Sequence, residues 1–270
     1  MPKEMLTVVD KPLIHHAVEE AAAAGIEEFI LVNGRGKSAL EDHFDKAFEL
    51  EATLEARGKT ARLEEARQLM PPPGNVVSVR QQTPLGLGHA VWCARHAVGD
   101  EPFAVFLCDD LVLSEQPCIG QLLDVHAETG GNVVAVEEVP RELTSRYGVL
   151  DVGKDDGRLA EVKGLVEKPD PKDAPSTLTI FGRYVLLPEI FGHLGRQEPG
   201  AGNEIQLTDA MAKMIGHAPF HGLRIEGTRF DCGSKLGFLK ANIAFGLADP
   251  GLGRELASYL DHLETNRKPD

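Results

Sequence analysis

The sequence predicts an α/β protein in which a mixed, mainly parallel sheet is flanked by helices, with a small mixed β region in the second half. Two observations predict this class. In the first half, short apolar runs alternate with helical patterns, as they do where helices cover both faces of a largely parallel sheet. After Pro140, glycines separate short β-rich runs instead. The 270 residues, of which 42% are hydrophobic, are enough to bury the core of one large domain.

The helices and strands of the first half follow from this alternation. Leu13 to Ala24 has helical composition and stops at Gly25, which can form a left-handed cap, and the apolar run Phe29 to Val32 is short enough for a buried strand. The pattern continues with predicted strands at Val76 to Val79, Phe103 to Leu107 and Val133 to Val136, and with predicted helices at Gly88 to Ala97 and Ile119 to Glu128.

The remaining segments depart from the alternation. Residues 41–69 are rich in Glu, Ala, Leu and Arg and are closed by three prolines, which predicts a helical excursion at the edge of the sheet. Beyond Pro140, the β-rich runs include Tyr147 to Val152 and Thr177 to Leu187. Helices are predicted at Glu204 to Ile215, Lys235 to Leu247 and Leu252 to Leu263, because their apolar residues recur at helical spacing.

The charge and the cysteines exclude several classes of function. The 28 basic and 42 acidic side chains give a formal charge of -14, which repels polyanions and argues against a nucleic-acid partner. The four cysteines show no Cys-x-x-Cys spacing, so neither a zinc site nor a disulfide framework is predicted. No apolar run approaches the roughly 20 residues of a membrane span, and the first ten residues lack a signal-peptide pattern. We therefore expect a cytoplasmic protein that binds no membrane.

A glycine-rich segment from Gln81 to Ala90 lies between a predicted strand and a predicted helix. That position is the carboxyl end of the sheet, where α/β proteins bind ligands. The side-chain amide of Gln81 can pair with the edge of a pyrimidine, and Gly86 lets a ring approach the backbone closely. The alternative is a turn without a ligand, in which His89 only begins the helix.

Three aspartates are candidates for holding a cation. Asp109 and Asp110 follow the apolar strand that ends at Leu107, and Asp231 lies far downstream, two residues before Gly233. Adjacent residues of a strand point to opposite faces, so only one of the first two is expected to hold the ion. Mg²⁺ prefers one or two carboxylates together with phosphate oxygens. The alternatives are a solvated strand end for the first pair and a helix cap for Asp231.

The segment Val166-Glu167-Lys168-Pro169 combines an acid and a base at the end of a β-type run. Glu167 could accept hydrogen bonds from sugar hydroxyl groups, while Lys168 could meet a phosphate as a compact point charge. The alternative is an exposed strand end without a ligand.

The order of the motifs makes these separate signals specific. The chain carries, in sequence, Pro-Lys-Glu-Met, Gln-Gln-x-Pro-x-Gly-x-Gly-His-Ala, x-Asp-Asp, Arg-Tyr-Gly-Val, Val-Glu-Lys-Pro, Gly-Arg-Tyr-Val, Glu-Ile-Gln-Leu-Thr-Asp-Ala and Asp-Cys-Gly-x-Lys-Leu-Gly. This series resembles the bacterial UTP:glucose-1-phosphate uridylyltransferases (UDP-glucose pyrophosphorylases), of the sugar nucleotidyltransferase family, over essentially all 270 residues. In that family the lysine motif at Met1 to Ile14 follows a strand and a Gly-x-Gly-Thr-Arg loop, so we expect such a segment to precede Met1.

The resemblance implies a Rossmann-like fold of the nucleotide-diphospho-sugar transferase type. It implies a single domain over residues 1–270, with a nucleotide-binding half at 1–140, a sugar-binding half at 141–233 and C-terminal helices at 234–270. The implied reaction is Mg²⁺-dependent attack by glucose 1-phosphate on the α-phosphorus of UTP, which gives UDP-glucose and pyrophosphate. The family usually forms homodimers or homotetramers.

The resemblance also implies roles for individual residues. Asp109 and Asp231 would hold Mg²⁺, and Lys3, Asp109 and Lys168 would be catalytic. Gln81 and Gly86 would contact uracil, while Gly148 and Glu167 would contact glucose. Lys168 would also bind the sugar phosphate. Further substrate-binding positions would be Asp110, Gly182 and Tyr184.

Two alternatives and one departure stay open from sequence. The shared Gln, Asp and Glu-Lys-Pro positions would also suit a glucose-1-phosphate thymidylyltransferase, although the insertion at residues 48–54 resembles the uridylyl enzymes. A non-catalytic paralogue that binds sugar nucleotides is the second alternative. Cys108 stands where the family more often has proline, and we expect its thiol to be tolerated but open to oxidation.

Overall fold

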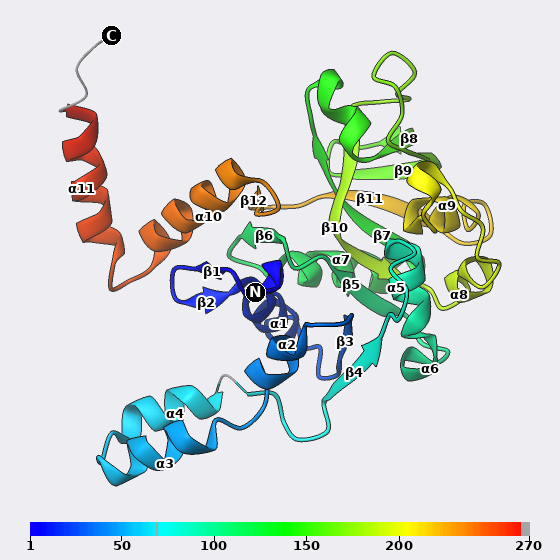
Figure 1. The fold of residues 1–270 in the computed structure, drawn as a ribbon. Coiled ribbons are helices and arrows are strands. Elements are labelled where there is room, and N and C mark those ends of the chain that lie inside the picture. Colours follow the sequence, from blue (N-terminus) through cyan, green and yellow to red (C-terminus); the bar gives the residue numbers. More distant parts are fainter. Residues whose placement is uncertain (69, 266–270) are drawn as a thin grey trace.

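The fold was determined from a computed structural model that describes residues 1–68 and 70–265 (Figure 1). Its helices are α1 (Leu13–Ala23), α2 (Ser38–His43), α3 (Phe48–Ala56), α4 (Thr60–Gln68), α5 (Leu87–Cys93), α6 (Arg95–Val98), α7 (Cys118–Thr129), α8 (Ile190–Leu194), α9 (Leu207–Ala212), α10 (Lys235–Ala248) and α11 (Gly253–Thr265). Short 3₁₀ helices are η1 (Lys3–Met5), η2 (Arg141–Arg146) and η3 (Ala201–Asn203). The strands are β1 (Thr7–Val8), β2 (Lys11–Pro12), β3 (Phe29–Asn33), β4 (Val76–Arg80), β5 (Phe103–Phe106), β6 (Asp110–Leu113), β7 (Asn132–Glu138), β8 (Gly148–Asp155), β9 (Leu159–Glu167), β10 (Leu178–Leu186), β11 (Phe220–Arg224) and β12 (Thr228–Asp231).

A six-stranded sheet forms the centre, in the order β5-β10-β7-β11-β9-β8. The prediction of a mixed sheet flanked by helices is confirmed. The prediction that the sheet is mainly parallel is wrong, because parallel pairing among the described strands is confined to β7–β11 and β3–β4. The reason is β10, which enters between β5 and β7 and runs antiparallel to both. Strands β5 and β7 therefore run in the same direction but are separated by β10, which runs in the opposite direction.

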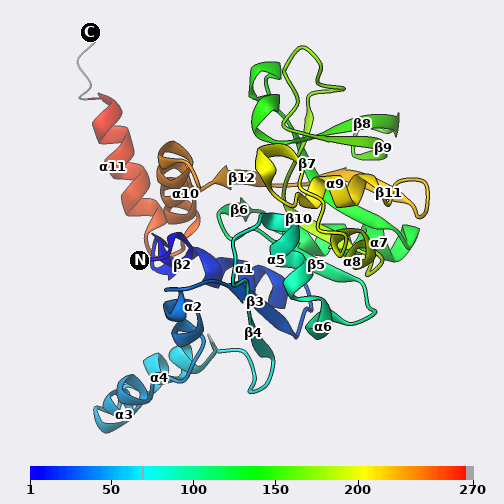
Figure 2. The ribbon, with the colours of Figure 1, turned by 45° about the vertical axis from the view of Figure 1, so that its right-hand side comes forward.

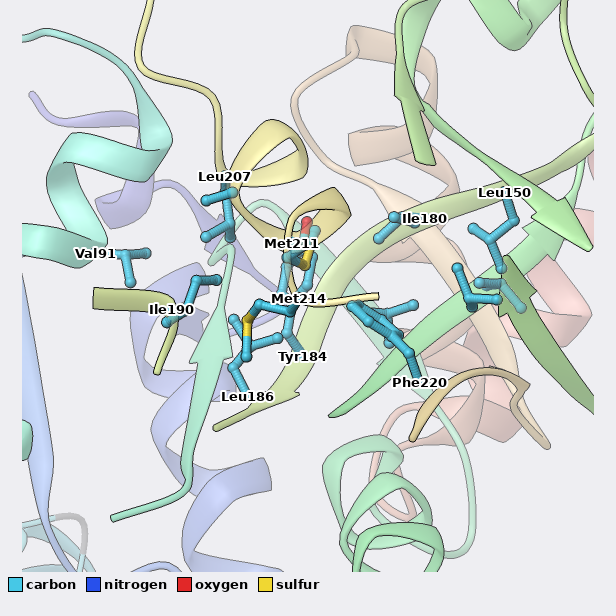
Figure 3. Packing of buried hydrophobic residues seen from close by; sticks show 14 of the residues in the cluster. Val91, Leu150, Ile180, Tyr184, Leu186, Ile190, Leu207, Met211, Met214 and Phe220 are labelled. Carbon is cyan, nitrogen blue, oxygen red and sulfur yellow. The ribbon is translucent and has the colours of Figure 1, made fainter. Parts of the chain in front are cut away.

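Two hydrophobic clusters cover the two faces of this sheet. Side chains of β10 alternate between them, with Tyr184 and Leu186 on one face and Phe181 and Val185 on the other. The first face is covered by α5, α8 and α9, and Figure 3 shows Leu207 and Met211 packing above it. Helix α7 covers the second face. Because β10 is buried along its whole length, it is the strand around which both layers pack.

A buried ion pair joins the N-terminal helix to the central strand. Arg183, whose side chain is fully buried on β10, donates to both carboxylate oxygens of Glu20 on α1 at 2.7–3.1 Å. The same carboxylate accepts a hydrogen bond from the Ile119 N–H in the first turn of α7. This contact fixes α1, α7 and β10 relative to one another.

Three short sheets lie outside the central one. The hairpin β1–β2 precedes α1, the parallel pair β3–β4 follows it, and β6 pairs with β12. In the last pair Asp110 lies opposite Asp231, so the ladder brings together acidic residues that are far apart in the sequence.

Two groups of helices extend away from the sheet. The predicted excursion at residues 41–69 consists of the end of α2 with α3 and α4, and Figures 1 and 2 both show α3 and α4 projecting as an arm. Leu69, the last residue of the predicted segment, lies outside the described residues. At the other end of the chain, α10 and α11 extend from β12.

Among residues 1–68 and 70–265, no helix combines the length and apolar character that a membrane span needs.

Candidate active site

Two aspartate carboxylates converge at one end of the β6–β12 ladder. Asp109 precedes β6 and Asp231 ends β12, and the Cys232 N–H donates to the Asp109 carbonyl at 2.7 Å. A Cβ placed on Gly233 would lie 3.0 Å from Asp231 Oδ1 and 3.2 Å from Asp109 Oδ2. The two carboxylates therefore face the same small volume, as the sequence predicted for a shared cation. Asp231 does not cap α10, because Ser234 accepts the capping hydrogen bond from the Gly237 N–H.

Two cationic side chains face these carboxylates. Lys3 Nζ lies 2.6 Å from Asp109 Oδ2, and Arg146 Nη2 lies 3.7 Å from Asp231 Oδ2. Burial lowers the pKa of Lys3, but the hydrogen bond and the charge of Asp109 outweigh it, so the pKa lies above its ordinary value. Sequence reasoning placed Lys3 here but missed Arg146, for which the only signal was its place in the Arg-Tyr-Gly-Val motif.

The chemistry of the carboxylate pair fits a hard divalent cation. Among residues 1–68 and 70–265 there is no group of three or more His, Cys, Asp or Glu side chains that could enclose a metal by themselves. Two converging carboxylates leave the remaining positions to water and to phosphate oxygens, which is how proteins commonly hold Mg²⁺.

Asp110 is engaged by the protein itself. Its carboxylate accepts hydrogen bonds from the Gly182 N–H at 2.8 Å and from Arg229 Nε at 2.7 Å. Burial raises the pKa of Asp110, and the positive charge of Arg229 opposes this. Gly182 has no room for a side chain, because a Cβ there would lie 2.5 Å from Leu107. Tyr184 is buried in the first hydrophobic cluster. The protein itself thus engages the Asp110 carboxylate and the Gly182 N–H, and it buries the Tyr184 ring.

A second group of predicted residues meets where β8 and β9 pair. Gly148 lies opposite Glu167, and a Cβ on Gly148 would lie 3.3 Å from Glu167 Oε2 and 3.2 Å from Thr208. Lys168 has a φ of 47°, which is uncommon for a residue other than glycine. Its N–H donates to the Tyr147 carbonyl at 3.0 Å, and its Nζ lies 3.2 Å from Glu167 Oε1. An acid, a base and a glycine therefore lie together at this end of the β8–β9 pair.

The glycine-rich segment forms a third group. Gln81 Nε2 donates to the Gly86 carbonyl and to His89 Nδ1, both at 3.0 Å. Gly86 has a φ of 114°, and a Cβ there would lie 2.8 Å from the Ile205 carbonyl oxygen. The Ile205 N–H donates in turn to the Leu85 carbonyl at 2.7 Å. This turn is thus built against the segment that leads into α9.

The segment from Glu204 to Thr208 connects the second and third groups. It touches Gly86 at one end and Gly148 at the other. The sequence predicted only that a helix would begin at Glu204, whereas α9 begins at Leu207. Backbone hydrogen bonds to the glycine-rich turn hold the first residues in an extended form, and no local pattern reveals them.

Comparisons with known proteins identify the family of this chain. A family model described as Nucleotidyl transferase matches residues 1–244. A UTP–glucose-1-phosphate uridylyltransferase of Komagataeibacter xylinus is 61% identical over 236 residues, which cover 87% of this chain and 83% of that protein.

Two solved structures are also similar. UTP-bound UGPase from Acinetobacter baumannii superimposes with a TM-score of 0.87 and 41% identity, and the match covers 99% of this chain and 92% of that one. A UDP-glucose pyrophosphorylase complexed with UDP-glucose gives a TM-score of 0.82 and 40% identity, with 91% of this chain and 90% of that one covered. These proteins share both the fold and a substantial part of the sequence with this chain.

Proposed function

The chain belongs to the nucleotidyl transferase family and, within it, to the UTP–glucose-1-phosphate uridylyltransferases, and we propose a reaction for its site on that premise. It is a nucleotidyltransferase enzyme that transfers the uridylyl group of UTP to glucose 1-phosphate. A phosphate oxygen of glucose 1-phosphate attacks the α-phosphorus of UTP. The bond between that phosphorus and the oxygen bridging to the β-phosphate breaks, and pyrophosphate leaves. The names of the similar proteins favour UTP over the dTTP of a thymidylyltransferase.

One observation carries the proposal: the Asp109 and Asp231 carboxylates converge beside Lys3. Transfer between two polyanions needs positioning and positive charge more than a covalent intermediate. We propose that Asp109 and Asp231 hold Mg²⁺. Bound there, the ion supplies positive charge beside the phosphates. Lys3 provides further positive charge on the same side, since its raised pKa keeps it protonated.

The other residues divide between base and sugar. We propose that Gln81 and Gly86 contact uracil, that Gly148 and Glu167 contact glucose, and that Lys168 binds the sugar phosphate. We propose that three of the predicted positions support the site and do not touch substrate. The Gly182 N–H donates to the Asp110 carboxylate, and Tyr184 is buried. This division agrees with a single domain of a nucleotide-binding half (1–140), a sugar-binding half (141–233) and C-terminal helices from residue 234.

Two strands have one edge that pairs with no other described strand. Strand β3 pairs only with β4, and β5 pairs only with β10, among the described strands. Each therefore presents an edge at which backbone groups can accept another strand.

A homodimer or homotetramer and a cytoplasmic location complete the proposal. The exposed apolar side chains of α10, such as Leu236 and Leu239, suit contacts between copies. The four cysteines are free, which agrees with a reducing compartment.

The test is pyrophosphate release with UTP, glucose 1-phosphate and Mg²⁺. We expect Asp109→Asn and Asp231→Asn to lower the rate at least about 100-fold, whereas the exposed Glu28→Gln should leave it unchanged. Turnover that survives Asp231→Asn would contradict the assignment. UDP-glucose binding without pyrophosphate release would favour the non-catalytic alternative.

A further inference from the structure

Arg146 lies between the two parts of the site that the proposed reaction must join. It ends η2, and Gly148 on the sugar side follows two residues later. Its guanidinium Nη2 lies 3.7 Å from Asp231 Oδ2 on the cation side. The intervening residue, Tyr147, accepts the hydrogen bond from the Lys168 N–H. A phosphate that joins a sugar near Gly148 to a nucleotide near Asp231 would therefore lie next to this guanidinium.

The contacts of Arg146 differ from those of the other two arginines nearby. Arg183 is fully buried with hydrogen bonds at 2.7–3.1 Å to Glu20, and Arg229 is 9% exposed with a 2.6 Å contact to Asp110. Arg146 is 56% exposed, and its ion pair within residues 1–68 and 70–265 is the longer 3.7 Å contact with Asp231. Of these three, Arg146 keeps most of its N–H donors open to a ligand.

The guanidinium of Arg146 is nevertheless positioned by an aromatic ring. Its guanidinium lies 5.7 Å from the centre of the Tyr147 ring, within the range of a cation–π contact. A guanidinium offers a planar pair of donors that matches two phosphate oxygens, and a phosphate competes well with a single distant carboxylate contact.

We propose that Arg146 is a phosphate-binding residue of this site, which contacts the phosphate next to the sugar and exchanges its contact with Asp231 for that one when substrate binds. This inference rests on the proposed function. It adds a third cation to Lys3 and Lys168, and it makes the loop before β8 part of the phosphate site as well as of the sugar site.

The test compares binding of UDP-glucose and of uridine by calorimetry. Arg146→Met keeps a long unbranched side chain but removes the charge. We expect it to weaken UDP-glucose binding by about 10- to 100-fold, the size of a charged hydrogen bond, with uridine binding unchanged. Arg146→Lys should restore part of the loss. The control is Arg57→Met, at the exposed end of α3 and distant from the site, which should match the wild type.

The outcomes separate the inference from its premise. Failure of the wild-type chain to bind UDP-glucose would overturn the proposed function and this inference with it. Normal wild-type binding together with an Arg146→Met affinity within threefold of it would overturn the inference alone. Equal loss of uridine and UDP-glucose binding in Arg146→Met would also overturn it, because that pattern indicates a general structural defect.

Discussion

Gly86 shows how closely single residues of the site are packed. Its φ of 114° is one that side-chain-bearing residues rarely adopt, and a Cβ would lie 2.8–2.9 Å from the backbone of Ile205. The turn that Gln81 supports and the segment that leads into α9 therefore approach each other backbone to backbone. Any side chain at this position would push the glycine-rich turn away from Glu204 and Ile205.

We expect Gly86→Ala to lower the free energy of unfolding by about 2–4 kcal/mol, from backbone strain and overpacking together. Gly36→Ala is the matched control, because Gly36 also has a positive φ, of 80°, but has no atom within 4 Å of its Cβ position. Strain alone should cost the control about 1–2 kcal/mol. Urea unfolding measures both variants. Equal losses would show that the approach to Ile205 contributes nothing.

Three of the four cysteine thiols, including that of Cys108, are protected by burial. Burial raises the pKa of the Cys108, Cys118 and Cys232 thiols to about 12, so roughly one in ten thousand of each is ionised at pH 8. We expect iodoacetamide at that pH to label Cys93 first, because its thiol is the least buried of the four. In folded Cys93→Ser protein, mass spectrometry should find almost no label. Rapid labelling of Cys108 there would revive the expectation that it oxidises easily.

Helix α1 illustrates how one element connects the N-terminal motif to the sheet. On its exposed side, Glu19 accepts a hydrogen bond from Lys11 Nζ at 2.8 Å and lies 3.5 Å from His15 Nε2. Burial would raise the pKa of Glu19, but the contacts with His15 and Lys11 lower it to about 2. Glu20, the next residue, faces inward to Arg183.

The lowered pKa of Glu19 predicts a dependence of stability on pH. A carboxyl group with a lowered folded-state pKa stabilises the protein above its unfolded pKa, and this contribution is lost as the pH falls towards the folded value. We expect Glu19→Gln to cost about 0.5–1 kcal/mol at pH 7, since the side chain is 41% exposed and solvent screens the pair. The difference should disappear between pH 4.5 and pH 2. Urea unfolding at pH 7, 4 and 3 checks it, with Glu28→Gln as control. A difference that grows on acidification would contradict it.

The elements that the sequence predicted are those with their own local pattern. The helix α1, the strands β3, β4, β5 and β7, and the helices α7, α10 and α11 lie close to their predicted positions. The strands β6 and β12 were not predicted, because each has four residues and becomes a strand only by pairing with the other. In the site, the shared role of Asp109 and Asp231 was expected from the resemblance. The contact of Lys3 with Asp109 and the places of Arg146 and Thr208 were not predicted, since they depend on how distant parts of the chain pack.

The whole molecule carries an apolar surface on its C-terminal helices. Leu236, Leu239, Ile243 and Leu247 lie at helical spacing on α10 and are 63%, 59%, 42% and 41% exposed. This stripe is the pattern of a helix that packs against a partner. A second copy of the chain is the partner that the proposed oligomer supplies.

We expect the double variant Leu239→Ser and Ile243→Ser to shift the protein from dimer or tetramer to monomer. Light scattering measures the mass. Glu255→Gln, an acidic position in the first turn of α11, is the control and should leave the mass unchanged. A monomeric wild type at micromolar concentration, or an unchanged mass for the double variant, would contradict the proposed interface.

The arm formed by α3 and α4, together with the extended α10 and α11, has a consequence for how the protein moves through solvent. A chain with two projecting parts experiences more friction than a compact sphere of equal mass (Figures 1 and 2). Its Stokes radius is therefore larger than its molecular weight alone suggests. On a gel-filtration column calibrated with compact proteins, even a single chain will elute early, in the region of a larger globular protein.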